Sequence, residues 1–155
     1  SLRMPLIVRY PPEIRPGVNG RDMVLNLDFA PTFLDYAGVP VPESMQGRSL
    51  RGVLRGRTPP GWRRSIYYHY YEYPAVHQVK RHYGVRTRRY KLIHFYYDID
   101  AWELYDLESD QHEMKNLIDD PSYDRVEESL RKRLKELRTS YNVPDEGTAL
   151  TAGNN

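Results

Sequence analysis

The chain has 155 residues, of which 39% are hydrophobic and 28% are charged, and it contains no cysteine. This is enough apolar material for the core of one ordinary domain. The lack of cysteine excludes disulfides, thiolate zinc sites and cysteine nucleophiles within the chain. No stretch approaches the roughly 18 apolar residues of a membrane helix. The chain begins with Ser1, and its first residues resemble neither a signal nor a transit peptide, so we expect a piece of a longer protein.

The charge is unevenly distributed along the chain. Residues 1–100 carry 16 Lys and Arg against 8 Asp and Glu, whereas residues 101–155 carry 7 against 13. Six of the 14 tyrosines lie between Tyr67 and Tyr83. Arginine offers fixed hydrogen-bond donors to anions, and an aromatic face covers the apolar side of a sugar ring. The basic segment therefore suits an anionic or carbohydrate ligand, although two faces of opposite charge are an equal alternative.

The first 60 residues predict a strand followed by short helices. Residues 3–10 form an apolar run of strand type, which two prolines bring to an end. A helix is expected next, with Asp28 as its N-cap and Gly38 as its stop. Its apolar side is expected to comprise Phe33, Leu34 and Ala37.

A linker and a change of periodicity then divide the chain. After a helical turn that ends near Leu54, residues 56–62 are rich in Pro and Gly, and we expect a boundary near 58–61. Beyond it, four β-branched or aromatic runs at hairpin-like spacing predict an antiparallel sheet. These runs are 65–73, 80–87, 90–97 and 101–107, with a tight connection at 87–89.

One helix is expected to cover that sheet. Between residues 122 and 141 an apolar stripe recurs every three or four positions, at Val126, Leu130, Leu134, Leu137 and Tyr141. The polar face, which includes Arg133, is expected to be solvated. The predicted fold class is α+β, a small four-stranded antiparallel sheet packed by a C-terminal helix. Residues 144–155 are expected to be a disordered tail.

The familiar catalytic motifs are absent from the sequence. It contains no glycine-rich nucleotide loop, P-loop, HExxH, GxSxG or EF-hand motif. None of the five histidines has a spacing typical of a metal site, and His69 and His94 are expected to be packed within strands. We therefore predict no catalytic residue and no metal ligand in this chain.

One short stretch concentrates polar groups suited to ligand binding. Between the first two expected strands the chain carries Glu72, Tyr73, His77, Arg81 and His82. A carboxylate, a phenol, two imidazoles and a guanidinium can together bind a sugar or an anion. The same residues could form a solvated hairpin edge whose charges discourage strand pairing. We favour the first interpretation and predict these five as substrate-binding residues.

Five segments carry a series of motifs. They are SLRMPLIV (1–8), DFAPTFLDYAG (28–38), QGRSL (46–50), RTRRYKLI (86–93) and ELYDLESD (103–110), the last followed by Glu113 and Asn116. In this order they resemble the C-terminal part of formylglycine-dependent sulfatases of the alkaline-phosphatase-like superfamily, over residues 1–141. Residues 69–98 are most similar to the bacterial N-acetylglucosamine-6-sulfatase branch. Gln111 stands where the family usually has proline.

The resemblance implies a division of labour. Residues 1–60 would be the end of the catalytic alkaline-phosphatase-like α/β domain, with a strand and short helices. Residues 61–143 would be a C-terminal sulfatase subdomain that closes one side of the substrate cleft. The family's formylglycine, made from a C/S-x-P-x-R motif, and its Ca²⁺ ligands precede this segment, and no such motif occurs here. The chain alone is therefore expected to be inactive and to contribute substrate specificity and structural support.

Partners and location follow from the same resemblance. The full-length enzyme would act on a sulfated carbohydrate, with neither nucleic acid nor membrane as a partner, and would be periplasmic or secreted. Exposed apolar surface is expected to promote self-association of this chain. Two alternatives stay open: a stand-alone module that binds anionic glycans or nucleic acid, and a phosphoesterase or phosphonate hydrolase of the same superfamily.

Overall fold

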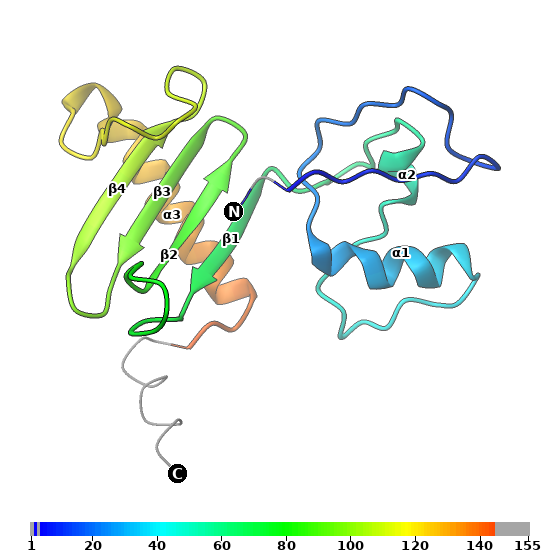
Figure 1. Cartoon of the computed structure of the whole chain (residues 1–155), viewed down its shortest axis with the longest axis horizontal. Coiled ribbons are helices and arrows are strands. Elements are labelled where there is room, and N and C mark those ends of the chain that lie inside the picture. The colour runs from blue at the N-terminus through cyan, green and yellow to red at the C-terminus, as the bar shows by residue number, and fades with distance from the viewer. Residues whose placement is uncertain (1, 3, 145–155) are drawn as a thin grey trace, which may run out of the picture. The chain divides into compact units, whose positions relative to one another are not determined.

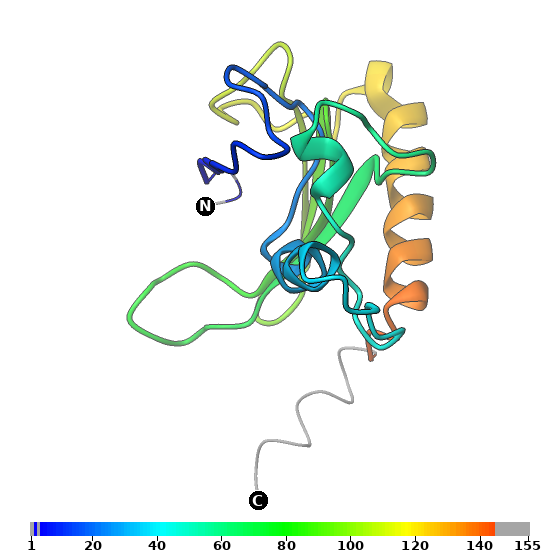
Figure 2. The ribbon, with the colours of Figure 1, turned by 90° about the vertical axis from the view of Figure 1, so that its right-hand side faces the viewer.

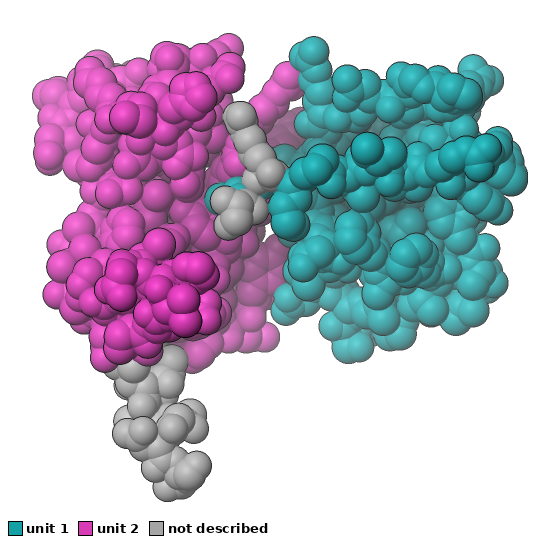
Figure 3. All heavy atoms as spheres, viewed as in Figure 1, with its two compact units in different colours: residues 1–63 teal, residues 64–155 magenta. Residues whose placement is uncertain are grey.

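The computed structural model describes residue 2 and residues 4–144, and it divides into two compact units, residues 1–63 and 64–155 (Figures 1 and 3). The division lies close to the predicted boundary at 58–61. The assignment of the first unit to a larger catalytic domain stays a prediction. Apart from Pro144, the predicted tail 144–155 lies outside the described residues.

The second unit is built on a four-stranded antiparallel sheet. Its strands are β1 (Ser65–Tyr70), β2 (His82–Thr87), β3 (Tyr90–Phe95) and β4 (Ala101–Asp106), and they pair in the order β1-β2-β3-β4. The tight connection between β2 and β3 is confirmed, and the Thr87 hydroxyl there accepts a hydrogen bond from the backbone N–H of Tyr90 at 2.8 Å. The predicted sheet is therefore correct, with strands up to three residues shorter than expected.

A single long helix covers one face of this sheet (Figure 2). The 3-10 turn η2 (Pro121–Tyr123) leads into α3 (Asp124–Ser140). Within the predicted stripe, three leucines are at most 5% exposed, and they pack against fully buried strand residues. The leucines are Leu130, Leu134 and Leu137, and their partners include Val85, Leu92 and Leu104. The stripe is confirmed, although Tyr141 at its end is 37% exposed.

Arg133 lies on the exposed polar face of α3, as expected, and its side chain also contacts the sheet. Its Nε donates a hydrogen bond to the hydroxyl of Ser65 at 2.8 Å, and Ser65 is only 6% exposed. Its Nη1 lies 2.9 Å from a carboxylate oxygen of Glu136. A helical period places Arg133 beside the buried stripe, but it does not show that an edge strand lies within reach of so long a side chain.

Residues of the ELYDL motif in β4 bond to two other segments. Asp106 bonds to the turn before β3, and Leu104 bonds to Asn116 in the loop that follows β4. The carboxylate of Asp106 is 1% exposed and accepts hydrogen bonds from Nε and Nη2 of Arg89. The side-chain oxygen of Asn116 accepts from the backbone N–H of Leu104 at 2.9 Å. Its amide nitrogen donates to the carbonyl of Trp102 at 3.2 Å. Asn116 therefore satisfies backbone groups at the outer edge of β4, and the pair of Asp106 with Arg89 ties β4 to the turn before β3. The role of these residues in the fold is structural.

The described residues of the first unit form three short helices, η1 (Asn26–Asp28), α1 (Phe29–Tyr36) and α2 (Arg51–Leu54). Gly38 ends the α1 region with a φ of 70°, as predicted. Asp28 precedes α1 as predicted, but its side chain does not cap the helix. The buried carboxylate instead accepts the backbone N–H of Arg48 at 2.9 Å and pairs with Arg63. A competing charged partner far along the chain explains the difference.

Two of the motif segments are bound to each other in this unit. The hydroxyl of Thr32 accepts the backbone N–H of Leu50 at 2.8 Å, and the hydroxyl of Ser49 donates to Asp35 at 2.5 Å. Gly47 passes so close to η1, the turn that precedes α1, that an added Cβ would lie 1.9 Å from the carbonyl oxygen of Leu27. The QGRSL segment therefore needs its glycine to approach this turn.

One expectation for the first unit is wrong. Residues 4–10 form no strand, because no neighbouring strand is present among the described residues of this unit to pair with their backbone groups. A local apolar pattern predicted the strand, but a strand also requires a pairing partner. The expected exposure of apolar surface is confirmed on α1, since Phe33 is 71% exposed and the buried α1 residues are Pro31 and Thr32.

Candidate functional site

The five predicted binding residues lie on the connection between β1 and β2, residues 71–81, and at the first position of β2. This loop projects from the sheet on the side opposite α3 (Figure 2). The β1–β2 and β3–β4 connections leave the same end of an antiparallel sheet, so residues 96–100 lie near the base of the loop. The sheet topology therefore brings two segments together that are separate in the sequence.

Arg81 contacts both the β1–β2 loop and the β3–β4 connection. Its Nε donates a hydrogen bond to the backbone carbonyl of Tyr73 at 2.6 Å. Its guanidinium carbon lies 4.2 Å from the centre of the Tyr97 ring. Among the described residues none accepts a hydrogen bond from its terminal nitrogens. The guanidinium is therefore held by the hydrogen bond from its Nε and by the Tyr97 ring against its face. Its terminal N–H groups are left to donate to an external acceptor.

Lys80 adds a second cation beside Arg81. It forms an ion pair with Asp98 and donates a hydrogen bond to the Tyr73 hydroxyl at 3.0 Å. The hydrogen bond to Asp98, followed by the one to Tyr73, raises the pKa of Lys80 above its ordinary value, so the ammonium stays charged at neutral pH. We call the five residues Tyr73, Lys80, Arg81, Tyr97 and Asp98 the Arg81 cluster.

His82 does not join the Arg81 cluster through its side chain. Its ring stacks on Tyr70 with centroids 5.4 Å apart, and Phe95 lies 5.2 Å away. Its Nδ1 lies 2.8 Å from the carbonyl oxygen of Lys80. Because Tyr83 faces α3, the alternation of a strand turns His82 to the opposite face. The ring thus packs on the sheet and holds the end of the loop.

Glu72 and His77 have exposed side chains on the loop. The structure therefore brings Tyr73 and Arg81 together and leaves Glu72 and His77 outside their contacts. Binding of a substrate by any of the five stays a prediction.

Three members of the Arg81 cluster are not among the predicted binding residues. Lys80 and Asp98 have no predicted role, and Tyr97 falls at the end of a predicted strand. The available signal was the predicted antiparallel order, which places the β1–β2 and β3–β4 connections at one end of the sheet.

Two further histidines lie in the sheet, as predicted. The nitrogens of His69 lie 2.9 Å from the hydroxyl of Tyr67 and 2.7 Å from that of Tyr96. His94 stacks on Trp102 with ring centres 4.1 Å apart. Within residues 4–144 no group of three or more His, Asp or Glu side chains has a geometry that could hold a metal ion. No helix in the described part of the chain is long and apolar enough to cross a membrane.

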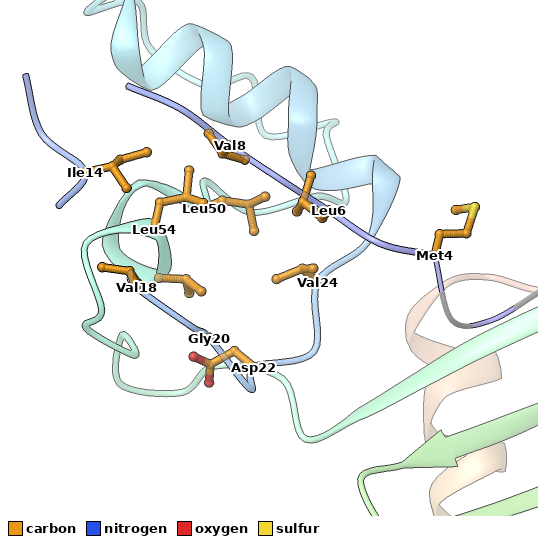
Figure 4. A pocket seen from close by; sticks show the side chains of 11 residues that line it. Met4, Leu6, Val8, Ile14, Val18, Gly20, Asp22, Val24, Leu50 and Leu54 are labelled. Atoms are coloured by element: carbon orange, nitrogen blue, oxygen red, sulfur yellow. The ribbon is translucent and has the colours of Figure 1, made fainter. Parts of the chain in front are cut away.

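The first unit has a hollow of a different kind (Figure 4). It encloses about 270 Å³ and includes one charged residue, Asp22, among its lining. The rest of the lining is apolar apart from Gly20 and comprises Met4, Leu6, Val8, Ile14, Val18, Val24, Leu50, Val53 and Leu54. A lining of this kind suits packing against another apolar surface and offers few donors to a sugar. The Arg81 cluster is therefore the better candidate for a polar ligand.

Comparison with known proteins connects these features to one family. Residues 1–140 match the family described as N-sulphoglucosamine sulphohydrolase, C-terminal. An N-acetylglucosamine-6-O-sulfatase from Bacteroides thetaiotaomicron is 53% identical over 148 residues, which cover 93% of this chain and 26% of that protein. An arylsulfatase from Clostridium perfringens is 32% identical, over 99% of this chain and 31% of its own length.

Solved structures show the same fold. A protein determined in complex with its substrate D-glucosamine-2-N,6-O-disulfate superposes with a TM-score of 0.89 at 52% identity, over 92% of this chain and 29% of that one. A phosphonate monoester hydrolase from Agrobacterium radiobacter superposes at 0.59 with 27% identity, over 73% of this chain and 24% of its own. The chain spans about a quarter to a third of the curated relatives named above. It belongs to the N-sulphoglucosamine sulphohydrolase C-terminal family and corresponds to the C-terminal region of sulfatases.

Proposed function

We propose that this chain is the C-terminal part of a sulfatase that removes sulfate esters from a glycan containing sulfated glucosamine. The supporting observation is the 53% identity, over 93% of the chain, with an N-acetylglucosamine-6-O-sulfatase. The solved relative with a TM-score of 0.89 holds a glucosamine disulfate, which agrees in sugar type. The fold alone does not identify the substrate, because a phosphonate monoester hydrolase shares it. The sugar type therefore comes from the relatives.

The β1–β2 loop would contact the sugar. The terminal nitrogens of Arg81 can donate to a hydroxyl, carboxylate or sulfate oxygen, and the stacking on Tyr97 fixes their direction. Glu72 and His77, exposed on the same loop, would make further contacts with the glycan. His82 and Tyr73 would act mainly by position, since each contacts the backbone or side chain of a cluster member.

The sulfate-ester chemistry itself does not fit the residues of this chain. Its sequence contains no C/S-x-P-x-R motif from which a formylglycine could arise. Its described residues offer no carboxylate and imidazole group suited to a calcium ion. We therefore assign the nucleophile and the metal to a preceding domain of the complete enzyme, which would be periplasmic or secreted, and assign specificity and structural support to this chain.

A comparison of three substrates in the complete enzyme tests this proposal. The complete protein would be assayed for kcat/KM on glucosamine-6-O-sulfate, on an aryl sulfate and on an aryl phosphonate monoester. The proposal expects sulfate release from the sugar to have the highest kcat/KM. A higher value for the phosphonate monoester would overturn it in favour of the second candidate, a phosphonate hydrolase, which the 27% identical solved relative supports.

A further inference from the structure

The second half of α3 carries a concentrated positive charge. Residues 131–138 contain five Lys and Arg and one acidic residue, Glu136. Glu136 is already engaged, because one of its oxygens lies 2.9 Å from Nη1 of Arg133. The chain from residue 101 onward is acidic as a whole, so the sequence average conceals this local excess of cations.

Three of these cations lie along one hollow between α3 and the sheet. The hollow has a volume of about 280 Å³, and its lining includes Arg131, Lys135 and Arg138. Their spacing of four and three residues places them on one side of the helix, over two turns or about 10 Å. The other lining residues are Tyr83, Trp102, Leu134, Thr139 and Val143.

Trp102 orients the guanidinium of Arg131. The guanidinium carbon lies 3.6 Å from the centre of the indole ring, and the His94 ring stacks 4.1 Å from that centre at 11°. Two groups so close to one ring centre must lie on opposite faces, so the indole is sandwiched. Nε of Arg131 also donates to Glu127 at 2.6 Å. No described residue accepts a hydrogen bond from its terminal nitrogens.

The other two cations complete the hollow. The guanidinium carbon of Arg138 lies 4.4 Å from the centre of the buried Tyr83 ring, which fixes it against the sheet, and its Nη2 donates a hydrogen bond to the carbonyl oxygen of Pro144 at 3.4 Å. The side chain of Lys135 is exposed between them, with no ion-pair partner among residues 4–144. Oriented guanidinium groups and an unpaired ammonium are suited to the sulfate or carboxylate groups of a ligand. The indole is covered on both faces, so a sugar ring would not stack on it.

We infer that Arg131, Lys135 and Arg138 form a second glycan-binding site, which holds sulfate or carboxylate groups of an extended sulfated oligosaccharide. The site lies on the α3 side of the sheet, opposite the β1–β2 loop (Figure 2). It would retain a polymer at a place separate from the candidate sugar contacts and raise the local concentration of substrate. The choice of a sulfated glycan, and not another polyanion, rests on the proposed function.

A charge reversal with a matched control tests this site. Lys135→Glu and Lys132→Glu change the net charge equally on the same helix, and both residues are exposed, but only Lys135 lines the hollow. Binding of the complete protein to a heparin octasaccharide would be measured by calorimetry. Lys135→Glu is expected to weaken binding about tenfold or more, as the loss of a charged hydrogen bond does, and Lys132→Glu much less.

A second pair of variants and two other probes extend the test. Arg131→Gln should weaken binding more than Arg125→Gln, which lies outside the lining, and circular dichroism would check that each variant folds. If Arg131→Gln fails to fold, the lysine pair decides. A fully desulfated octasaccharide and single-stranded DNA of equal charge should both bind more weakly than the sulfated octasaccharide.

Several outcomes would overturn the inference: no binding at physiological salt, equal effects of the two lysine variants, or equally tight binding of DNA. The readout is binding, so it separates the two proposals. A protein with sulfatase activity on glucosamine-6-O-sulfate but no Lys135-dependent binding would retain the proposed function and lose this site. Lys135-dependent binding without sulfatase activity would support the site and contradict the proposed function.

Discussion

Each unit depends on a buried carboxylate that pairs with an arginine from another segment. Asp28 is fully buried and pairs with Arg63, and Asp106 is 1% exposed and pairs with Arg89. Both aspartates also accept hydrogen bonds from backbone N–H groups. The burial of such a carboxylate is offset by the arginine and the backbone N–H groups that donate to it. Removal of any one of these groups leaves the others without partners and destabilises the fold. In this chain Asp28 and Asp106 therefore act in folding.

The Asp106 carboxylate makes the stability of the second unit sensitive to acid. Hydrogen bonds from Arg89 hold the pKa of Asp106 below its ordinary value. Its stabilising effect is fully present above about pH 4, the ordinary range of an aspartate, and is lost as the pH falls through the lower folded-state pKa. Asp106→Asn should reduce the free energy of unfolding at pH 7 by about 1.5–3 kcal/mol and should flatten its decline below about pH 4.

Urea unfolding of the 155-residue chain at a series of pH values would measure this effect. Asp119→Asn is the matched control, because it removes the same charge from an exposed position. The free energy of unfolding of this control should depend on pH nearly as that of the wild type does. Identical profiles for Asp106→Asn and wild type would show that the Arg89 pair does not contribute as described.

At the scale of elements, the sequence predicted what local patterns determine. The alternation of residues, the turn at 87–89 and the stripe along α3 each depend on neighbours within a few positions, and all were confirmed. The failures depend on distant partners. Residues 4–10 have strand composition but no pairing partner among the described residues, and Asp28 binds Arg63 instead of capping α1. The contact of the exposed Arg133 with Ser65 was likewise not predicted. Periodicity contains no information about such contacts.

The candidate site shows the same limit. Tyr73 and Arg81 lie eight residues apart on one loop, and their proximity could be guessed from the sequence. Tyr97 and Asp98 join them only because the sheet places two connections at the same end. The pairing of Trp102 with Arg131 likewise depends on the packing of α3 across the sheet. The sequence shows which residue types are present, but which of them lie close together could be known only from the order and packing of the strands and α3.

Truncation of the central leucine tests the packing of α3. Leu134 is 3% exposed within the core of the second unit. Leu134→Ala should lower the free energy of unfolding by about 2–5 kcal/mol, because it removes buried methyl groups and leaves a cavity. The suitable control is Lys132→Ala, since Arg133 bonds to Ser65. Thermal and urea unfolding that show equal, small effects for both variants would mean that the helix is not packed in this way.

At the scale of the whole molecule, the two units differ in how much apolar surface they expose. Residues of the first unit with large exposed apolar side chains include Met4 at 74%, Ile7 at 92% and Phe33 at 71%. Such surface is unusual in a free monomer and favours association. In a complete enzyme the same surface would be the natural contact for a preceding domain, in agreement with the quarter of the relatives' length that this chain covers.

We therefore predict that the 155-residue chain self-associates as its concentration rises. Sedimentation velocity should show larger species at higher concentration, and Ile7→Ser together with Phe33→Ser should reduce them. Met114→Ser is the control, because Met114 is 83% exposed in the second unit. A chain that stays monomeric at every concentration would contradict the assignment of this surface to an interface.

The most direct test of the central claim compares two substrates in the complete enzyme that contains this chain. Arg81→Ala and His77→Ala should each lower kcat/KM on a 6-O-sulfated glucosamine glycan about tenfold to a hundredfold, the effect of losing one charged or polar hydrogen bond. Turnover of a small aryl sulfate should change little, because such a substrate is expected to make no contact with the loop. Arg88→Ala, in the exposed turn at the other end of the sheet, should affect neither substrate. Unchanged glycan kinetics in both variants, or equal losses on both substrates, would contradict the role of the β1–β2 loop in specificity.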